Sequence, residues 1–374
     1  MKPDARYLRR RTSVVSPEVR EQNERFWAHI RTISEETGYT GESSSVRSAQ
    51  DVKAVATALR ALGLKSDHVM GKDGVQTQFG ADLLSYLRFR ADILNQHVRG
   101  LLMDEAEAKR EFIRCFRRYK PNPLSVTWNK QKHEKQSPAY LTAIVNMILA
   151  ATLGESSCDF DPLSLTTVTI AGEPYRTLAR RVDGAYPGVV NPTAVWEIKE
   201  YYHTTTFGSR IADGIYETLL DGLELECLEA SAHGPIFHYL IIDAARTWWG
   251  QGNPYLCRLI DMLHMGYVDE VVFGREVERA MTAAAQTWLA HRRSRPATGG
   301  ATPQPEQLGA VPPPKHRRLA PADRRKRALK WNTWAVANGL PDCLADATES
   351  AEDRSTRLDW KNRRRGLAVD QDEK

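Results

Sequence analysis

Three residues near the middle of the chain are of the types that phosphodiester hydrolysis requires. Asp183 lies at a glycine-containing turn, where it is expected to end a strand. Thirteen residues separate it from Glu197-Ile198-Lys199, within an apolar segment expected to be the next strand. Because side chains alternate along a strand, Glu197 and Lys199 are expected on one face, where Asp183 of the neighbouring strand can join them.

Two carboxylates and a lysine in one place suit metal-assisted hydrolysis of a phosphate ester. Asp183 and Glu197 offer the hard oxygen ligands that Mg²⁺ prefers. A bound Mg²⁺ lowers the pKa of a coordinated water and neutralises charge on the phosphate. Lys199 is suited to orient the attacking water and to stabilise the developing negative charge. The alternative is a structural ion pair at a strand end.

This arrangement resembles the PD-(D/E)-x-K nuclease superfamily, most familiar from type II restriction endonucleases. The resemblance covers residues 137–245 and rests on Asp183, on Glu197-Ile198-Lys199 and on their spacing; Val182 stands where many members have proline. It implies an α/β, restriction-endonuclease-like core with a central mixed sheet flanked by helices. It also implies a Mg²⁺-dependent endonuclease for double-stranded DNA, acting as a homodimer because two strands need two active sites.

Further acids and donors are expected around this centre. The resemblance makes Glu155 a third metal-ligand candidate, although a surface glutamate at a helix end explains it equally. Asp159 and Asp161 compete for that role, and a turn around Pro162 accounts for them more simply.

DNA contacts are expected from two polar segments. His203 and Arg210 follow the Glu-x-Lys strand and suit phosphate binding; a polar loop capped by Ser209 is the alternative. Lys130 and Lys132 lie in a basic, aromatic segment that can contact base edges in a groove. A solvated loop before a helix is the simpler account of that segment.

Helical periodicity dominates the first 120 residues. Ser16-Pro17-Glu18 is typical of a helix start, with a cap followed by proline in the first turn. Further helices are expected at 52–62, 81–103 and 104–119, the last acidic at its beginning and basic at its end, as the helix dipole favours.

The pattern changes after Pro121 to strands between helices, which predicts an α/β core. The expected elements are a helix at 141–153, strands at 166–170, 177–182 and 193–199 with a turn at 171–174, a helix at 211–223, a strand at 236–242, and helices at 254–265 and 275–289.

Four regions follow from these patterns: a helical region, residues 1–120, that could grip DNA; a nuclease core, 121–290; a basic Pro/Arg-rich linker, 291–327; and a short helix with a charged tail, 328–374. Residues 291–374 hold 18 lysines and arginines against 11 acidic residues. Since the chain carries +5, the remaining residues carry −2. A basic tail on a near-neutral body suggests contact with nucleic acid, or else a solvated extension.

Other classes gain little support. The five scattered cysteines indicate no disulfide framework or zinc site, and no secretory signal or membrane-length apolar run is present. The cytoplasm is therefore expected. No phosphate-binding Gly-x-x-x-x-Gly-Lys-Ser/Thr loop occurs, so no nucleotide cofactor is expected. A non-catalytic nucleic-acid-binding protein, and a repair or junction nuclease with the same core, remain as alternatives.

Overall fold

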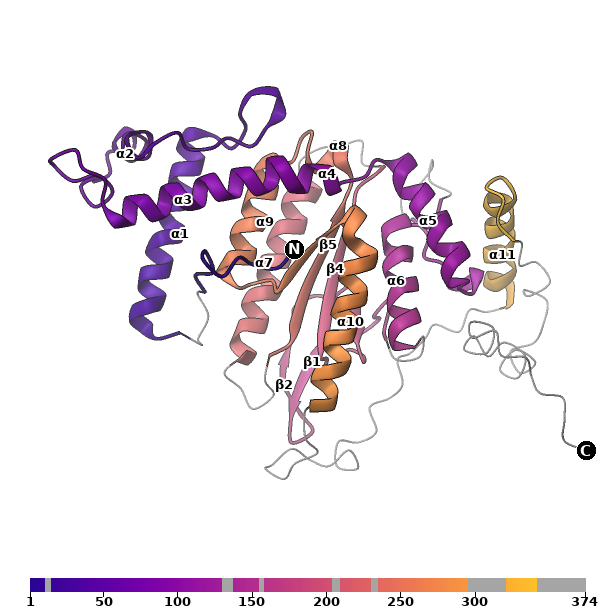
Figure 1. The fold of residues 1–374 in the computed structure, drawn as a ribbon. Coiled ribbons are helices and arrows are strands. Elements are labelled where there is room, and N and C mark those ends of the chain that lie inside the picture. Colours follow the sequence, from indigo (N-terminus) through magenta and orange to yellow (C-terminus); the bar gives the residue numbers. More distant parts are fainter. Residues whose placement is uncertain are drawn as a thin grey trace, which may run out of the picture.

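The computed structural model describes residues 1–10, 15–129, 137–154, 158–203, 209–229, 235–294 and 321–341. These residues form a mixed α/β fold with a helical N-terminal region, which confirms that part of the sequence prediction (Figure 1). No described helix is both long enough and apolar enough to cross a membrane.

Side-chain caps begin the N-terminal helices. Ser16 caps the first helix by accepting a hydrogen bond from Val19, and Asp51 and Thr77 cap the next two. The region consists of α1 (Pro17–Thr37), η1 (Glu42–Ser44), α2 (Val52–Ala61), α3 (Gln78–Asp92), the π-helical segment η2 (Ile93–Val98) and α4 (Arg99–Leu101). The predicted helix at 81–103 is therefore three helical segments in succession.

A capping box begins the helix that leads into the core. The Asp104 side chain accepts from the Glu107 amide, and the Glu107 side chain accepts from the Asp104 amide. The helical elements that follow are α5 (Glu105–Tyr119), η3 (Pro123–Ser125), α6 (Tyr140–Leu153), α7 (Ser209–Glu229), α8 (Ala245–Trp248), α9 (Asn253–Met265), η5 (Gly274–Glu276), α10 (Val277–Ser294) and α11 (Pro321–Val336).

A four-stranded mixed sheet forms the centre of the core, in the order β3–β4–β5–β6. Its strands are β3 (Gly184–Tyr186), β4 (Ala194–Glu200), β5 (Phe237–Asp243) and β6 (Glu270–Phe273). The β3 strand is antiparallel to β4, whereas β4, β5 and β6 run parallel. A separate antiparallel pair consists of β1 (Thr167–Ile170) and β2 (Glu173–Thr177).

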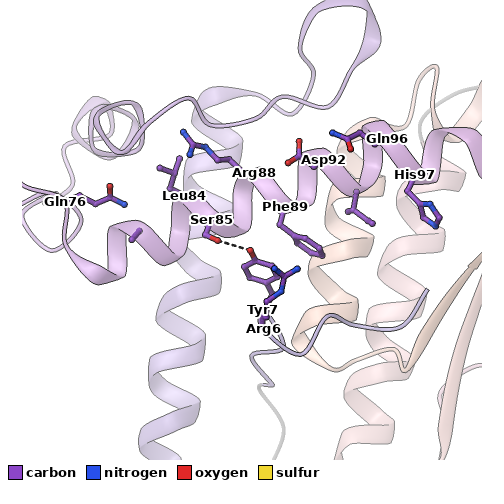
Figure 2. Close-up of a pocket in the computed structure, with 12 residues that line it drawn as sticks. Arg6, Tyr7, Gln76, Leu84, Ser85, Arg88, Phe89, Asp92, Gln96 and His97 are labelled. Atoms are coloured by element: carbon purple, nitrogen blue, oxygen red, sulfur yellow. Dashed lines mark hydrogen bonds between the residues drawn. The ribbon is translucent and has the colours of Figure 1, made fainter.

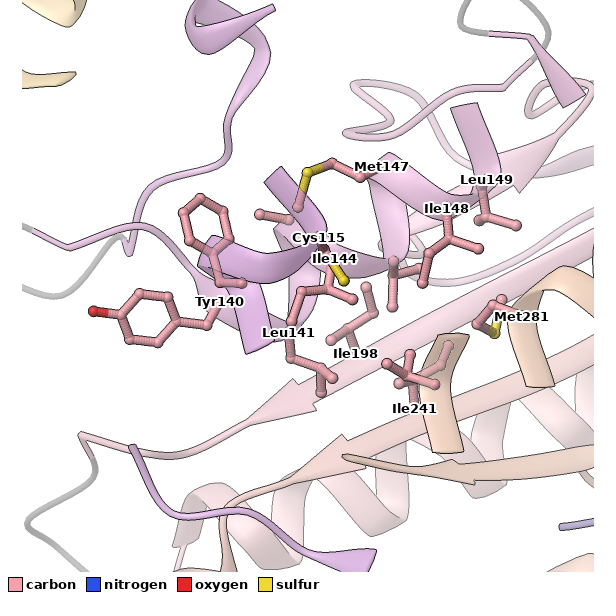
Figure 3. Close-up of a cluster of buried hydrophobic side chains, with 14 of the residues drawn as sticks. Cys115, Tyr140, Leu141, Ile144, Met147, Ile148, Leu149, Ile198, Ile241 and Met281 are labelled. Atoms are coloured by element: carbon pink, nitrogen blue, oxygen red, sulfur yellow. The ribbon is translucent and has the colours of Figure 1, made fainter. Parts of the chain in front are cut away.

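Helices cover both faces of this sheet (Figure 1). On one face, Trp196, Ile198 and Ile241 pack with apolar residues of α6 and α10, as Figure 3 shows for Ile198, Ile241 and Met281. On the other face, Leu240 and Ile242 pack against α7 and α9. Both faces of the parallel strands are buried, as is usual for strands joined by helical crossovers.

The strand predictions were wrong between residues 173 and 186, where β2 and β3 fall partly in predicted turns, and at β6. Residues 178–182 form no strand; the hairpin β1–β2 ends at Thr177, and its turn is Ala171–Gly172. Asp183 therefore precedes β3 rather than ending a strand. The β6 strand was not predicted, because it has only four residues between two helices, and so short a segment shows no recognisable alternation.

The last described helix packs onto the core. The α11 helix begins at Pro321, so it includes residues that the sequence suggested were linker. Trp331 is fully buried and stacks on Phe116 of α5, with ring centroids 4.7 Å apart. Trp334 meets Phe112 edge-on at 5.5 Å. These contacts hold α11 beside α5 (Figure 1).

Candidate active site

The β4 strand presents Glu197 and Lys199 on the face that α7 covers. Lys199 Nζ donates to Glu197 Oε2 at 2.9 Å, and Glu197 is fully buried. Trp196 and Ile198 point to the opposite face, where they join the α6–α10 core. The alternation predicted from the sequence is confirmed, because an apolar partner layer fixes the register of the strand.

Asp183 adjoins this pair from the segment that enters β3. Its amide donates to Trp196 O at 3.1 Å and to Glu197 Oε1 at 3.2 Å. Its Oδ2 accepts from the Ile198 amide at 2.8 Å. Asp183 is exposed, whereas Glu197 is not. The structure thus brings together the three residues singled out from the sequence, with one carboxylate open to solvent.

Gly184 makes this close approach possible. A Cβ at that position would lie 2.1 Å from ring atoms of Trp196. Any larger residue would push β3 away from β4 and move Asp183 off the Ile198 amide.

Three charged residues that sequence reasoning missed complete the cluster. Arg180 donates to Asp221 Oδ2 at 2.6 Å, to Glu197 Oε2 at 3.0 Å and to Glu217 Oε2 at 3.2 Å. Lys199 also donates to Glu217 Oε2, at 2.8 Å. We call these six residues the ion cluster: Arg180, Asp183, Glu197, Lys199, Glu217 and Asp221.

Helix α7 supplies two of the four acids in the ion cluster. Glu217 and Asp221 are four residues apart, so they share one side of the helix. Gly214, on the same side, leaves room for Lys199 and Tyr201; a Cβ there would lie 2.9 Å from the Tyr201 hydroxyl. An acid in phase with the buried positions Thr218 and Leu225 is the signal that could have identified Asp221.

The cluster shifts the proton affinity of its acids in opposite directions. Desolvation, and next the repulsion by Glu197, raise the pKa of Asp183 to about 6, since protein surrounds most of the side chain even though part of it reaches solvent. Desolvation likewise raises the pKa of Asp221 to about 7, against the opposing effect of Arg180. For Glu197 desolvation is outweighed by Lys199 and Arg180, so its pKa is lowered. Attraction to Glu197 and Asp183 overcomes desolvation and raises the pKa of Lys199.

The ion cluster has more acids than bases and leaves polar atoms unpaired. Four carboxylates surround two cations. Asp221 is fully buried, and its Oδ1 has no hydrogen-bond partner among the described residues. His238 of β5 is opposite Val195, on the same face as Glu197, and its buried Nε2 also lacks a partner in the described part of the chain. Surplus carboxylate oxygens and an unpaired imidazole nitrogen are ligand types that a divalent cation accepts. No three of these atoms lie within 4.8 Å of one another in this structure, so a cation would have to draw them together.

The remaining predicted residues are less directly connected to this centre. His203 lies 3.3 Å from Ser137 Oγ through Nε2 and 3.3 Å from Glu105 through Nδ1. Arg210 is in the first turn of α7. Glu155, Lys130 and Lys132 lie outside the described residues.

Asp159 and Asp161 form part of a turn. Asp159 Oδ1 accepts from the Asp161 amide at 3.4 Å, and the Asp159 backbone pairs with Ala185. This geometry fits the turn expected around Pro162.

Among the described residues, three potential ligand atoms within 4.8 Å of one another are found at Glu111, Cys115 and Glu278, between α5 and α10. The Arg114 guanidinium already contacts both carboxylates and lies 3.5 Å from the Cys115 sulfur. Desolvation raises the pKa of the Cys115 thiol to about 12, so the thiol stays protonated. This group is better explained as an ion pair between two helices.

A polar cavity of about 800 Å³ extends along α3, apart from the ion cluster (Figure 2). Arg88, Gln96 and His97 of α3 and η2 line it, and Tyr7 donates to or accepts from Ser85 across it at 2.8 Å. Its lining shares no residue with the ion cluster.

Comparisons with known proteins divide the chain at the same place as the fold. Residues 103–288 match the family described as "Domain of unknown function (DUF7687)", and residues 15–97 match "Domain of unknown function (DUF7690)". No curated protein and no solved structure matches the chain. The first match contains the sheet and the whole ion cluster, and the second contains the helices α1 to α3.

Proposed function

We propose that this chain is a Mg²⁺-dependent DNA endonuclease with a restriction-endonuclease-like core, most simply a type II restriction enzyme acting as a homodimer. The observation that carries the proposal is the meeting of Glu197 and Lys199 of β4 with Asp183 of the segment that enters β3. Lys199 Nζ lies 2.9 Å from Glu197, and Asp183 is open to solvent. A buried lysine and carboxylate are costly unless they are paired, and a solvent-accessible acid beside them is what a substrate-facing site needs.

The residues of the cluster have separate roles in the proposed reaction. Asp183 and Glu197 would hold Mg²⁺, and Lys199 would orient a water whose oxygen adds to phosphorus while one P–O ester bond breaks. When bound, Mg²⁺ supplies a lowered pKa for that water and charge neutralisation on the phosphate. Lys199 remains protonated near neutral pH because Glu197 and Asp183 raise its pKa, so it donates hydrogen bonds and does not act as a base.

Cationic residues of the adjacent helices α5 and α11 support DNA as the partner. We call the following residues the basic surface: Lys109, Arg110, Arg117, Arg324, Arg325, Lys326 and Lys330. None of its members forms an ion pair with a carboxylate in the described ranges. Burial lowers the pKa of Lys330, as does repulsion by Arg327 and Lys326, which indicates positive charge without nearby compensation. A DNA backbone would neutralise this charge with release of counterions.

One observation favours a second candidate, a non-catalytic nucleic-acid-binding protein. Arg180 and Lys199 already neutralise Glu197, as they would in a purely structural network. In that case the basic surface would bind DNA and the ion cluster would only stabilise the fold.

Incubation of the purified chain with supercoiled plasmid separates these two functions. Cleavage is expected with Mg²⁺, none with EDTA, and binding without cleavage in Ca²⁺, whose looser coordination positions water poorly. Asp183→Asn should bind plasmid without cutting it. Discrete fragments would support restriction, and a smear would support a less specific nuclease. DNA binding without Mg²⁺-dependent cutting would overturn the enzyme proposal and favour the second candidate.

A further inference from the structure

The Arg180 guanidinium occupies the position in the ion cluster where carboxylates converge. It contacts Asp221 at 2.6 Å, Glu197 at 3.0 Å and Glu217 at 3.2 Å. These three acids come from two different elements, β4 and α7, and one planar cation joins them. Arg180 thus holds α7 to the sheet in the way that a divalent cation bridges carboxylates.

The Arg180 side chain can move out of the ion cluster more easily than the Lys199 side chain can. Lys199 extends from the middle of the sheet, and its side chain is 10% exposed. Arg180 belongs to the irregular residues between β2 and β3, and its side chain is 23% exposed. Because Arg180 lies outside the sheet, it can turn outward without disturbing β4 if another cation takes over its carboxylate partners, whereas Lys199 cannot.

Asp221 has an unused oxygen at the same place. The side chain is fully buried, its Oδ2 is bound to Arg180, and Oδ1 has no partner among the described residues. His238 adds a second buried atom, Nε2, that has no partner among the described residues. Desolvation lowers the pKa of this imidazole, and the charges of Glu197 and Arg180 act on it in opposite directions. Buried polar atoms without partners are uncommon in folded proteins, and an absent ion is one of the recognised explanations.

We propose that Arg180 is an internal counter-ion that a divalent cation displaces, and that Asp221 of α7 is a third carboxylate ligand beside Asp183 and Glu197. This inference rests on the metal site of the proposed nuclease and extends it to α7. It explains why four acids surround two bases: loss of one base leaves a net negative site for a cation of charge +2. It also gives the displaced Arg180 a new partner, because a guanidinium released toward solvent can contact a phosphate.

Calorimetric titration of the full chain with Mn²⁺, without DNA, tests the inference. Arg180→Gln removes the competing cation and should tighten Mn²⁺ binding by roughly tenfold or more, because the metal no longer has to displace a charge-assisted hydrogen bond. Asp221→Asn should weaken binding by roughly tenfold or more. Asp213→Asn, an exposed acid on the same helix, is the matched control and should bind like the wild type.

A measurement on the unaltered protein keeps the inference testable if Arg180→Gln does not fold. Phenylglyoxal modifies accessible guanidinium groups, and peptide mass spectrometry can assign the modified residue. Mn²⁺ should increase modification of Arg180 severalfold, while the exposed neighbour Arg181 should react equally with and without the metal. Unchanged labelling of Arg180, or absence of Mn²⁺ binding by the wild type, would overturn its role as a counter-ion.

The outcomes also separate this inference from the proposed function. Mn²⁺ binding that depends on Arg180 and Asp221, without any DNA cleavage, would support the inference and overturn the nuclease. Mg²⁺-dependent cleavage, with Asp221→Asn binding Mn²⁺ as the wild type does, would support the nuclease and remove Asp221 from the ligands.

Discussion

Two ion networks in this molecule differ in charge balance and in exposure, which is the contrast expected between a structural ion pair and the proposed active site. The first joins Arg90 of α3 to Asp261 of α9, with side chains 3% and 4% exposed. Both oxygens of Asp261 accept from Arg90, and Tyr86 donates to one of them at 2.6 Å. Arg90 also donates to Ser34 of α1 at 2.7 Å. One acid and one base are balanced, no member reaches solvent, and the network connects the N-terminal helices to the core.

In the ion cluster the acids and bases are not balanced, and some members reach solvent. Four acids meet two bases, Asp183 is exposed, and the Glu217 side chain is 42% exposed. An oxygen of the buried Asp221 is unpaired in the described part of the chain, but so is Nε of Arg90 in the first network, so the difference between the two lies in charge balance and exposure. A stable fold needs only the first arrangement, since a balanced, enclosed pair orients its neighbours and is costly to break. Surplus charge and solvent access make sense where a cation and a substrate are to be bound.

The largest expected effect is on the cleavage rate, from a substitution that removes a metal ligand of the ion cluster without unfolding the protein. Glu197→Gln keeps the shape of the side chain but removes a metal ligand, so the plasmid cleavage rate should fall by roughly 10³-fold or more. Binding of plasmid should be roughly unchanged, because no phosphate donor is removed. Lys199→Ala should also be inactive while still binding Mn²⁺. Gel assays measure these cleavage rates, and Glu173→Gln, which replaces an exposed acid, is the control. Wild-type cleavage by Glu197→Gln would remove the cluster from the chemistry.

The opposite result is expected for the Arg90–Asp261 network. Asp261→Asn leaves the fully buried Arg90 without its counter-ion, and should lower the free energy of unfolding by about 3–5 kcal/mol. Asp221→Asn should change it by less than about 1 kcal/mol, because Arg180 keeps Glu197 and Glu217 as partners. Urea unfolding monitored by circular dichroism measures both values. Equal destabilisation by the two substitutions would mean that the ion cluster is structural as well.

The sequence predicted the half of the site that lies on one strand. Glu197 and Lys199 follow strand alternation, and their face was fixed by Trp196 and Ile198, so local pattern was sufficient. Arg180 and Asp221 were missed because they are 41 residues apart and meet only when α7 packs on the sheet.

The same limit applies to the fold. Helical periodicity marked α1, α2, α5 and α6 well, and the Ser16 cap marked the start of α1, since these signals are local. The irregular run before Asp183 was mistaken for a strand: Leu178 and Val182 are apolar and buried, but they fill the gap between β2 and β3 without backbone pairing.

A smaller effect is expected from pH, through the two acids with raised pKa. The pKa values of Asp183 and Asp221, about 6 and about 7, exceed their ordinary value of 3.8. The folded chain therefore binds these protons more tightly than the unfolded chain, and the free energy of unfolding should decrease as pH rises from about 4 through 7. Melting temperatures from pH 5 to 8 should fall more steeply for the wild type than for Asp221→Asn without metal. Cleavage should show the opposite trend and decline below about pH 6, where Asp183 becomes protonated. Parallel melting curves for the two proteins would contradict the raised pKa of Asp221.

The smallest effect should come from the basic surface, which lies apart from both networks. Truncation before α11 would expose Phe112 and Phe116, so point substitutions test its charge without disturbing the core. Arg325→Gln with Lys326→Gln removes two exposed charges, and the slope of log K against log salt should become shallower by about 0.9 for each phosphate that the protein no longer neutralises. Lys65→Gln with Lys72→Gln, equally exposed on the N-terminal region, removes the same charge elsewhere and is the matched control.

Binding isotherms at several salt concentrations give the slopes. Sequencing of fragment ends gives the cut positions, which should be the same in all three proteins. If both double variants lower the slope equally, net charge rather than the α5–α11 surface determines the affinity. If the cut positions move with Arg325 and Lys326, this surface contributes to sequence recognition as well as to affinity.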